Sequence, residues 1–257
     1  MLNSVIKKLL TSTRKVISLS KDYVVFSGSI LPAPDIRWCG PEFKDNSYYL
    51  QSTESEATRL VTQFGCNKNS RILDIGCGQG RLPIGILRVI GELDYTGIDV
   101  DAKSINWCKH HIESKHPSFK FYHYNIANAR YNKRGVSLRE SFRFGLPDNS
   151  IDIIYLFSVF SHMTEADMRI YLSEFRRVLD SEGKVFFTTF VEEKVPNYSI
   201  NPDGYVFNRC SGNLHVVRYE KNYLFTIIRE NGFIVEKFTH RTEADNQSTI
   251  YLGKKHS

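Results

Sequence analysis

The chain has 257 residues, 41% of them hydrophobic and 13% aromatic, which is enough for one large domain or a domain with a small appendage. Its formal net charge is +6, but five basic side chains precede the first acid, Asp22, and the rest of the chain holds 29 basic against 28 acidic residues. A binder of phosphate backbones usually carries its basic stripe on the folded domain, so this distribution disfavours a nucleic-acid partner.

The cysteines show no Cys-x-x-Cys pair and no metal-ligand spacing. An odd, scattered set predicts reduced and mostly buried thiols in a cytoplasmic type of compartment, and no metal site. The five are Cys39, Cys66, Cys77, Cys108 and Cys210.

Residues 2–19 place apolar side chains at helical spacing with lysines and an arginine mostly opposite, which predicts a basic amphipathic helix. The segment is too polar to span a membrane and lacks the apolar run of a signal peptide. Three interpretations stay open: a helix packed on the folded domain, peripheral membrane contact through residues 1–21, or an organelle presequence. Residues 27–46, with three prolines and two glycines, predict an irregular linker. We therefore divide the chain into an extension over 1–50 and a folded domain over 51–257.

The folded domain begins with a helix expected over 47–64 and continues as alternating strands and helices. Such alternation predicts an α/β fold with a parallel sheet and helices on both faces, closed by an antiparallel pair of strands at its edge. The expected strands are 71–75, 95–99, 119–124, 151–156, 184–190, 233–239 and 248–252, and the further helices are 80–90, 102–115, 165–178 and 220–231.

Two stretches, 126–147 and 191–219, are long for connections in a compact domain. Both follow the carboxyl ends of strands, which is the edge where open α/β sheets bind ligands. We expect these two insertions to shape the pocket of a ligand.

The most specific motif is RILDIGCGQG, in which a strand ends at Asp74 and runs into a glycine-rich turn. The next strand, YTGIDVD, closes on Asp99, where a carboxylate can accept hydrogen bonds from a ribose. The third glycine, Gly80, comes one residue earlier than in a dinucleotide fingerprint, and Asp74 would set a negative charge beside any phosphate. The pattern therefore favours a smaller, cationic adenosyl ligand.

This segment resembles the first motif of the class I S-adenosylmethionine-dependent methyltransferases. The resemblance covers roughly residues 55–190, including GLPDNSIDIIYLFSVFSHMTEADMRIYLSEFRRVLDSEGKVFFTTF, and fits 220–252 more weakly. It implies a Rossmann-like sheet of seven mostly parallel strands with an antiparallel last strand, and S-adenosyl-L-methionine as cofactor. The implied cofactor-binding residues are Asp74, Gly76, Cys77, Gly78, Gly80, Asp99, Val100, Asn125, Ile126 and Phe157. For Asn125, a role in capping its own turn is equally open.

The fourth strand lacks the Asn/Asp-Pro-Pro-Tyr/Phe segment of enzymes that methylate adenine bases, which disfavours base N-methylation. His162 follows that strand and is the first candidate for a general base that removes a hydroxyl proton during methyl transfer. Capping of the helix over 165–178, or packing under the cofactor, is the alternative role. His215, in the second insertion, is the second candidate.

The sequence thus predicts a methyltransferase that acts on a hydroxyl of a small molecule or glycan, in the cytoplasm or at a membrane surface. Two rival hypotheses are methylation of protein or RNA, and a non-catalytic adenosyl-binding module docked through its N-terminal helix. The acceptor and the oligomeric state cannot be inferred from the sequence.

Overall fold

A computed structural model describes residues 21–38, 40–206, 212–243 and 245–255. The amphipathic helix expected over 2–19, and with it the membrane contact of residues 1–21, lies outside these residues. Within the described part of the chain, no helix is both long and apolar enough to cross a membrane.

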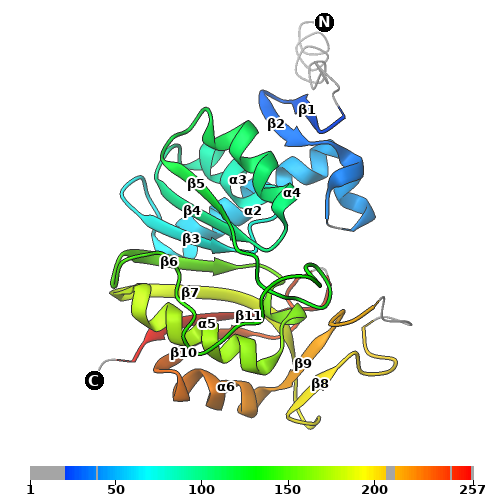
Figure 1. The fold of residues 1–257 in the computed structure, drawn as a ribbon, viewed down its shortest axis with the longest axis vertical. Coiled ribbons are helices and arrows are strands. Elements are labelled where there is room, and N and C mark those ends of the chain that lie inside the picture. The colour runs from blue at the N-terminus through cyan, green and yellow to red at the C-terminus, as the bar shows by residue number, and fades with distance from the viewer. Residues whose placement is uncertain (1–20, 39, 207–211, 244, 256–257) are drawn as a thin grey trace, which may run out of the picture.

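A central sheet organises the molecule (Figure 1). Its strands lie in the order β10 (Phe233–Thr239), β11 (Ser248–Lys254), β7 (Leu179–Glu192), β6 (Ile151–Leu156), β3 (Arg71–Ile75), β4 (Asp94–Asp99) and β5 (Phe119–His123). The pairs from β7 to β5 are parallel, whereas β11 runs antiparallel to both β7 and β10. The predicted sheet of seven mostly parallel strands with an antiparallel last strand is therefore confirmed.

Helices cover both faces of this sheet, as predicted (Figure 1). On one face lie α2 (Asn46–Phe64), α3 (Arg81–Val89) and α4 (Ala102–Cys108), which continues as a π-helical turn, Lys109–Glu113. On the other face lie α5 (Glu165–Val178) and α6 (Lys221–Glu230). Neighbouring residues of β3 enter different cores, because Ile72 packs with the first layer and Leu73 with the second. This double burial explains why the central strands read as continuous apolar runs rather than as alternating ones.

The segment expected to be an irregular linker contains regular structure. Strands β1 (Tyr23–Phe26) and β2 (Ser29–Pro32) form an antiparallel hairpin, followed by the 3-10 turns Pro34–Ile36 and Pro41–Lys44. The hairpin loop is Ser27-Gly28, and both residues have positive φ, as the tightest hairpin turns require. Ser-Gly between alternating apolar residues was the signal for this hairpin, and the prolines concealed it.

The two insertions differ in structure. Residues 126–147 form no helix or strand and are held by isolated bridges, one of them between Ile126 and Val136. The second insertion contains β8 (Tyr198–Ile200) and β9 (Val217–Glu220). Strand β9 pairs in parallel with the last residues of β7, and β8 pairs with β9. Because β7 extends well past the end of β6, its carboxyl end has a free edge, and β9 pairs with it.

Close contact between α2 and α3 yields the first prediction, on stability. A Cβ added to Gly85 of α3 would lie 1.9 Å from the backbone oxygen of Thr53 in α2. Alanine normally stabilises the interior of a helix by about 0.5–1 kcal/mol relative to glycine. Here we expect Gly85→Ala to lower the free energy of unfolding by about 1–3 kcal/mol, because the helices must separate.

Urea denaturation measures this change. Gly145→Ala is the matched control, since the nearest atom to its added Cβ is the Tyr124 hydroxyl at 3.8 Å. If the Gly85→Ala protein is as stable as the Gly145→Ala protein, then α2 and α3 can separate to admit the methyl group without loss of stability.

Candidate cofactor and acceptor site

The glycine turn lies at the carboxyl end of β3, and its three glycines have φ values of 73°, 52° and 78° at Gly76, Gly78 and Gly80. An added Cβ would lie 2.5 Å from Val159 at Gly76 and 2.6 Å from Ile112 at Gly80. At Gly78 no atom lies within 4 Å of that position. The outer two glycines thus allow close packing, and the middle one presents bare backbone to open space, where a ligand can approach.

Asp99 ties this turn to the end of β4. Its carboxylate accepts hydrogen bonds from the backbone N–H groups of Gly78 and Asp101, each at 2.8 Å. Burial raises the pKa of Asp99, and the two N–H donors oppose that rise. The structure therefore brings together the turn and the acid that the sequence singled out.

Asp74 and Cys77 lie beneath the turn rather than on its open side. The Asp74 side chain is 3% exposed and accepts a hydrogen bond of 2.6 Å from the Tyr95 hydroxyl. Burial raises the pKa of Asp74 to about 7, against the opposing effect of that hydrogen bond. Burial likewise raises the pKa of the Cys77 thiol, which packs against Gly97. Both residues support the turn from below, and Asp74 can act on a ligand through the field of its carboxylate.

The residues expected near an adenine lie together at the ends of β4 and β5. The Val100 carbonyl is 3.2 Å from Nε2 of His123, and Ile126 is 8% exposed. The exposed Asn125 accepts a hydrogen bond of 3.0 Å from the Asn132 side chain. Asn125 thus anchors the first insertion across seven residues instead of capping its own turn.

Sequence reasoning missed two charged residues beside Phe157, at the end of β6. The Arg81 guanidinium lies 4.4 Å from the centroid of the Phe157 ring and 3.6 Å from Oε1 of Glu56. Glu56 projects from the buried face of α2 and is 5% exposed. Its Oε2 lies 3.7 Å from Nε of Arg59, within ion-pair distance, but accepts no hydrogen bond. A buried carboxylate oxygen without a donor is costly unless a ligand supplies one. A glutamate among the apolar positions of the helix was the signal for this site.

His162 ends the 3-10 turn Phe160–His162 that follows β6. Its Nδ1 lies 3.0 Å from the Leu214 carbonyl, and its Nε2 lies 3.3 Å from Oγ of Ser158. Because a carbonyl can only accept, the ring proton is on Nδ1 and the lone pair is on Nε2. The N-cap of α5 is Thr164, whose side chain accepts from the Asp167 N–H, so the alternative role of His162 as that cap is wrong.

The two insertions meet at His162. From the first insertion, the Asn128 side chain donates to the His162 carbonyl at 3.0 Å, and the Tyr131 ring lies 5.7 Å from the imidazole. From the second, Leu214 binds the ring and His215 follows directly. The pKa of His162 is lowered to about 4, mainly by burial and also by the charge of Arg130, against the opposing effect of the Leu214 hydrogen bond. Burial and Arg130 also lower the pKa of His215, so both candidate bases lie near one cation.

The segment after β2 lies over the same region. The side chain of Gln79, within the glycine turn, donates to the Ile36 carbonyl. The Trp38 indole donates to Ser104 of α4 at 3.1 Å, and its ring lies 6.0 Å from that of Tyr131. Trp38 therefore spans the gap between α4 and the first insertion, although its side chain is 61% exposed. A groove of about 690 Å³ runs beside it, with Gln79 and Asp101 in its wall.

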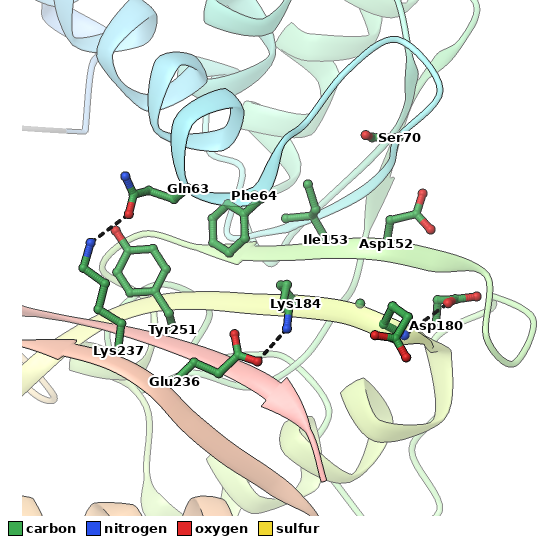
Figure 2. Close-up of a pocket in the computed structure, with 12 residues that line it drawn as sticks. Gln63, Phe64, Ser70, Asp152, Ile153, Asp180, Lys184, Glu236, Lys237 and Tyr251 are labelled. Atoms are coloured by element: carbon green, nitrogen blue, oxygen red, sulfur yellow. Dashed lines mark hydrogen bonds and ion pairs between the residues drawn. The ribbon is translucent and has the colours of Figure 1, made fainter. Parts of the chain in front are cut away.

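A second cavity, of about 350 Å³, lies at the opposite edge of the sheet (Figure 2). Its two lysines have partners, since Lys184 forms an ion pair with Glu236 at 2.5 Å and Lys237 donates to the Gln63 amide at 2.7 Å. This is the amino end of the parallel strands, whereas open α/β sheets bind ligands at the carboxyl end. We therefore place the functional site at the glycine turn and not in this cavity. Among the described residues, no three His, Cys, Asp or Glu side chains are grouped to hold a metal ion.

Comparison with known proteins agrees with this geometry. Residues 72–183 match the family model described as a methyltransferase domain. A tRNA (guanine-N(7)-)-methyltransferase of Oceanobacillus iheyensis is 24% identical over 198 residues, covering 73% of this chain and 86% of that protein. A probable methyltransferase of Aspergillus luteorubrus is 30% identical over 137 residues, which are 51% of this chain and 42% of the relative. The chain thus spans less than half of that second relative.

Among solved structures, a Burkholderia thailandensis 1,6-didemethyltoxoflavin-N1-methyltransferase shares the fold with a TM-score of 0.53 and 14% identity. The match covers 80% of this chain and 79% of that one, which holds bound S-adenosylhomocysteine and 1,6-didemethyltoxoflavin. Residues 72–183 thus match a methyltransferase domain, and the chain shares its fold with S-adenosylmethionine-dependent methyltransferases. The cofactor that these matches imply is S-adenosylmethionine. The resemblance predicted from the sequence is therefore confirmed.

The residues present fit this cofactor. Gly78 offers open backbone, and Asp99 offers a carboxylate at the end of β4. Oε2 of Glu56 faces Arg59 at 3.7 Å without a hydrogen bond, and it can accept one from an ammonium group. The positive Arg81 beside Glu56 suits a carboxylate, so the pair matches the two charges of an amino acid.

We predict that Asp99→Ala weakens binding of S-adenosylhomocysteine about 10- to 100-fold. The ribose loses a charged hydrogen-bond acceptor, and such bonds contribute about 1.5–3 kcal/mol. Titration calorimetry measures the dissociation constant. Asp94→Ala is the control, because Asp94 is exposed at the other end of β4. Equal affinities of the two variants would contradict the ribose assignment.

Proposed function

We propose that the chain transfers the methyl group of S-adenosylmethionine to a hydroxyl of a small molecule or a glycan. The observation that carries this proposal is the His162 imidazole. It bears its lone pair on Nε2 and lies where the two insertions meet beside the glycine turn. Val159, three residues earlier, packs on Gly76, so the histidine belongs to the wall of the cofactor site. The Burkholderia neighbour, which binds a small acceptor, supports a small-molecule substrate for this fold.

The cofactor supplies an activated methyl group, and the protein supplies position and a proton acceptor. Asp99 and Gly78 hold the nucleoside end, while Arg81 and Glu56 hold the amino-acid end. The acceptor oxygen attacks the methyl carbon in line with the breaking C–S bond, whose electron pair stays on sulfur. The hydroxyl proton passes to Nε2 of His162. Holding the two reactants in line is the main source of rate in such a reaction.

His215 has the weaker claim to the role of base. It lies next to Leu214 in the second insertion, is partly exposed, and shares with His162 the nearby Arg130. We assign His215 to the acceptor side of the pocket, where it can orient a polar substrate.

We also propose a cytoplasmic location, with 1–50 as an extension and 51–257 as the methyltransferase domain. The three described cysteines, Cys66, Cys77 and Cys108, are free and buried, which suits a reducing compartment. Residues 1–21 remain a candidate for peripheral membrane contact.

His162→Ala should lower turnover at least 100-fold while leaving the affinity for S-adenosylhomocysteine unchanged. A general base contributes about 100- to 10,000-fold, and the imidazole does not touch the glycine turn. Release of S-adenosylhomocysteine, with a metabolite extract as the pool of acceptors, measures turnover. His215→Ala is the matched comparison and should have the smaller effect. Full turnover of His162→Ala would remove His162 as base, and cofactor binding by the wild type without any methyl transfer would favour a non-catalytic module.

The pH profile of the same reaction is a second measurement. The pKa of His162 is lowered to about 4, so its lone pair stays available well below the ordinary pKa of about 6.5. Turnover should therefore persist between pH 6.5 and 5 instead of falling. In that window His162 makes stability fall as the pH drops, because its site binds a proton only in the unfolded chain. Asp74, whose pKa is raised to about 7, acts in the opposite direction, so folding must be monitored alongside turnover. An acid limb centred near 6.5 would show that a different group is the base.

A nucleic acid is the second candidate acceptor, and the first insertion favours it. Residues 126–147 contain five basic side chains and one acid, and the Oceanobacillus relative is named as a tRNA methyltransferase. If RNA is the acceptor, total tRNA should bind with an affinity that falls steeply with salt. Replacing the exposed Lys133 and Arg134 by glutamine should reduce that slope. Binding that is weak and independent of salt would leave the small-molecule proposal as the only one.

A further inference from the structure

A ring of hydrogen bonds lies directly behind His162. The Ser158 N–H donates to the Thr188 hydroxyl at 2.8 Å, and that hydroxyl donates to Oε1 of Gln247 at 2.8 Å. The Gln247 amide then donates to Oγ of Ser158 at 2.7 Å and to Oδ2 of Asp245 at 2.6 Å. Gln247 is 1% exposed and comes from the loop between β10 and β11, far from His162 in the sequence.

The directions of these bonds are fixed by chemistry. The Thr188 hydroxyl already accepts from an N–H, so its own proton points to Gln247, which sets the amide carbonyl on that side. The amide nitrogen must then donate to Ser158 and to the Asp245 carboxyl. Oγ of Ser158 therefore accepts from Gln247, and its own proton is left for one of two neighbours. These are Nε2 of His162 at 3.3 Å and Oγ of Ser161 at 3.1 Å.

The backbone of Ser158 adopts a strained conformation, which directs its hydroxyl toward Nε2 of His162. Its φ is 58°, in the left-handed region that residues other than glycine seldom adopt. The bond from its N–H to Thr188 stabilises this conformation, which aims Oγ at the histidine instead of along the path of the strand. Strain of this kind is retained where the position of a side chain matters.

We infer that Ser158 and Gln247 are positioning residues that present the unprotonated Nε2 of His162 to the acceptor. This inference rests on the proposed role of His162 as base. The Ser158 hydroxyl holds Nε2 before the acceptor arrives. When the acceptor hydroxyl enters, the Ser158 proton turns to Ser161 and frees the lone pair.

The step balances without any other reactant. The acceptor O–H bond breaks as the O–CH₃ bond forms, the C–S bond breaks onto sulfur, and the proton forms an N–H bond at Nε2. The sulfonium charge is thereby replaced by an imidazolium charge. The groups near the His162 imidazole are Arg130 and Tyr131 from the first insertion and His215 from the second. Asp245 is linked to it indirectly, through Gln247 and Ser158. Arg130 and His215 disfavour the imidazolium, and the Leu214 carbonyl, which accepts from Nδ1, opposes that effect.

Two variants test the pair, Ser158→Gly and Gln247→Leu. Glycine removes the hydroxyl and accepts the positive φ, and leucine removes the amide but retains bulk. Each should lower turnover about three- to tenfold, the scale of one neutral hydrogen bond, with affinity for S-adenosylhomocysteine unchanged. The double variant should be no slower than the slower single variant, because both act through one chain of bonds. Asn246→Gly is the control, since this exposed neighbour of Gln247 has a φ of 66° that glycine tolerates.

Nitrogen NMR of the protein labelled at histidine provides a readout that needs no acceptor. In the wild type the His162 ring should carry its proton on Nδ1, and its Nε2 resonance should move in Ser158→Gly and, to a lesser degree, in Gln247→Leu. An unchanged Nε2 resonance, or losses that add in the double variant, would overturn the inference. The two proposals fail differently. A fully active His162→Ala protein would refute the role of His162 as base. An inactive His162→Ala protein, together with an unchanged Nε2 resonance in Ser158→Gly and Gln247→Leu, would refute only the positioning role of Ser158 and Gln247.

Discussion

The contact between Gly76 and Val159 fixes the distance between the glycine turn and the segment that carries His162. It joins the turn after β3 to the segment after β6, and it leaves no room for a Cβ, since one would lie 2.5 Å from the valine methyl. The two proposed acceptor-side histidines, His162 and His215, follow Val159, whereas Gly78 and Asp99, proposed to hold the nucleoside, belong to the turn and to β4. Parallel pairing of β3 with both β4 and β6 keeps the three carboxyl ends at one edge. A donor and an acceptor bound there are therefore held by one rigid sheet.

The close packing at this end of the sheet also buries ionisable side chains. Asp74, Glu56 and His162 all have pKa values displaced mainly by burial, the acids upward and the histidine downward. Displaced values concentrate at functional sites because the geometry needed for chemistry also excludes water. Two of these three groups form hydrogen bonds: Asp74 accepts from the Tyr95 hydroxyl, and His162 donates to the Leu214 carbonyl. Glu56 keeps an oxygen without a hydrogen bond, which is why it is the residue we expect a ligand to complete.

Apart from β8 and β9 in the second insertion, the order and type of the elements from residue 46 onward could be predicted from the sequence, because strand burial and helix periodicity are local patterns. The glycine turn and Asp99 could also be predicted, since their spacing reflects one ligand. Gln247 and Trp38 could not, because each reaches the site from a segment distant in sequence and carries no motif. The hairpin β1–β2 could not be predicted for a different reason. The three prolines of residues 27–46 favour irregular structure, and they conceal the two-residue turn Ser27-Gly28.

The proposed acceptor pocket consists of the two insertions, whose structure the sheet does not determine. Asn132 binds Asn125, Asn128 binds the His162 carbonyl, and the Leu214 carbonyl binds the imidazole, so each insertion is fixed by polar contacts at a few points. Such contacts add little to the stability of the core, and the residues between them can change freely. Since the proposed base, His162, takes its orientation from these same contacts, we expect a change in either insertion to alter the choice of acceptor and the base together. The cofactor turn takes its contacts from Asp99 of β4, Val159 after β6, Ile36 after β2 and Ile112 after α4, which all lie outside the two insertions.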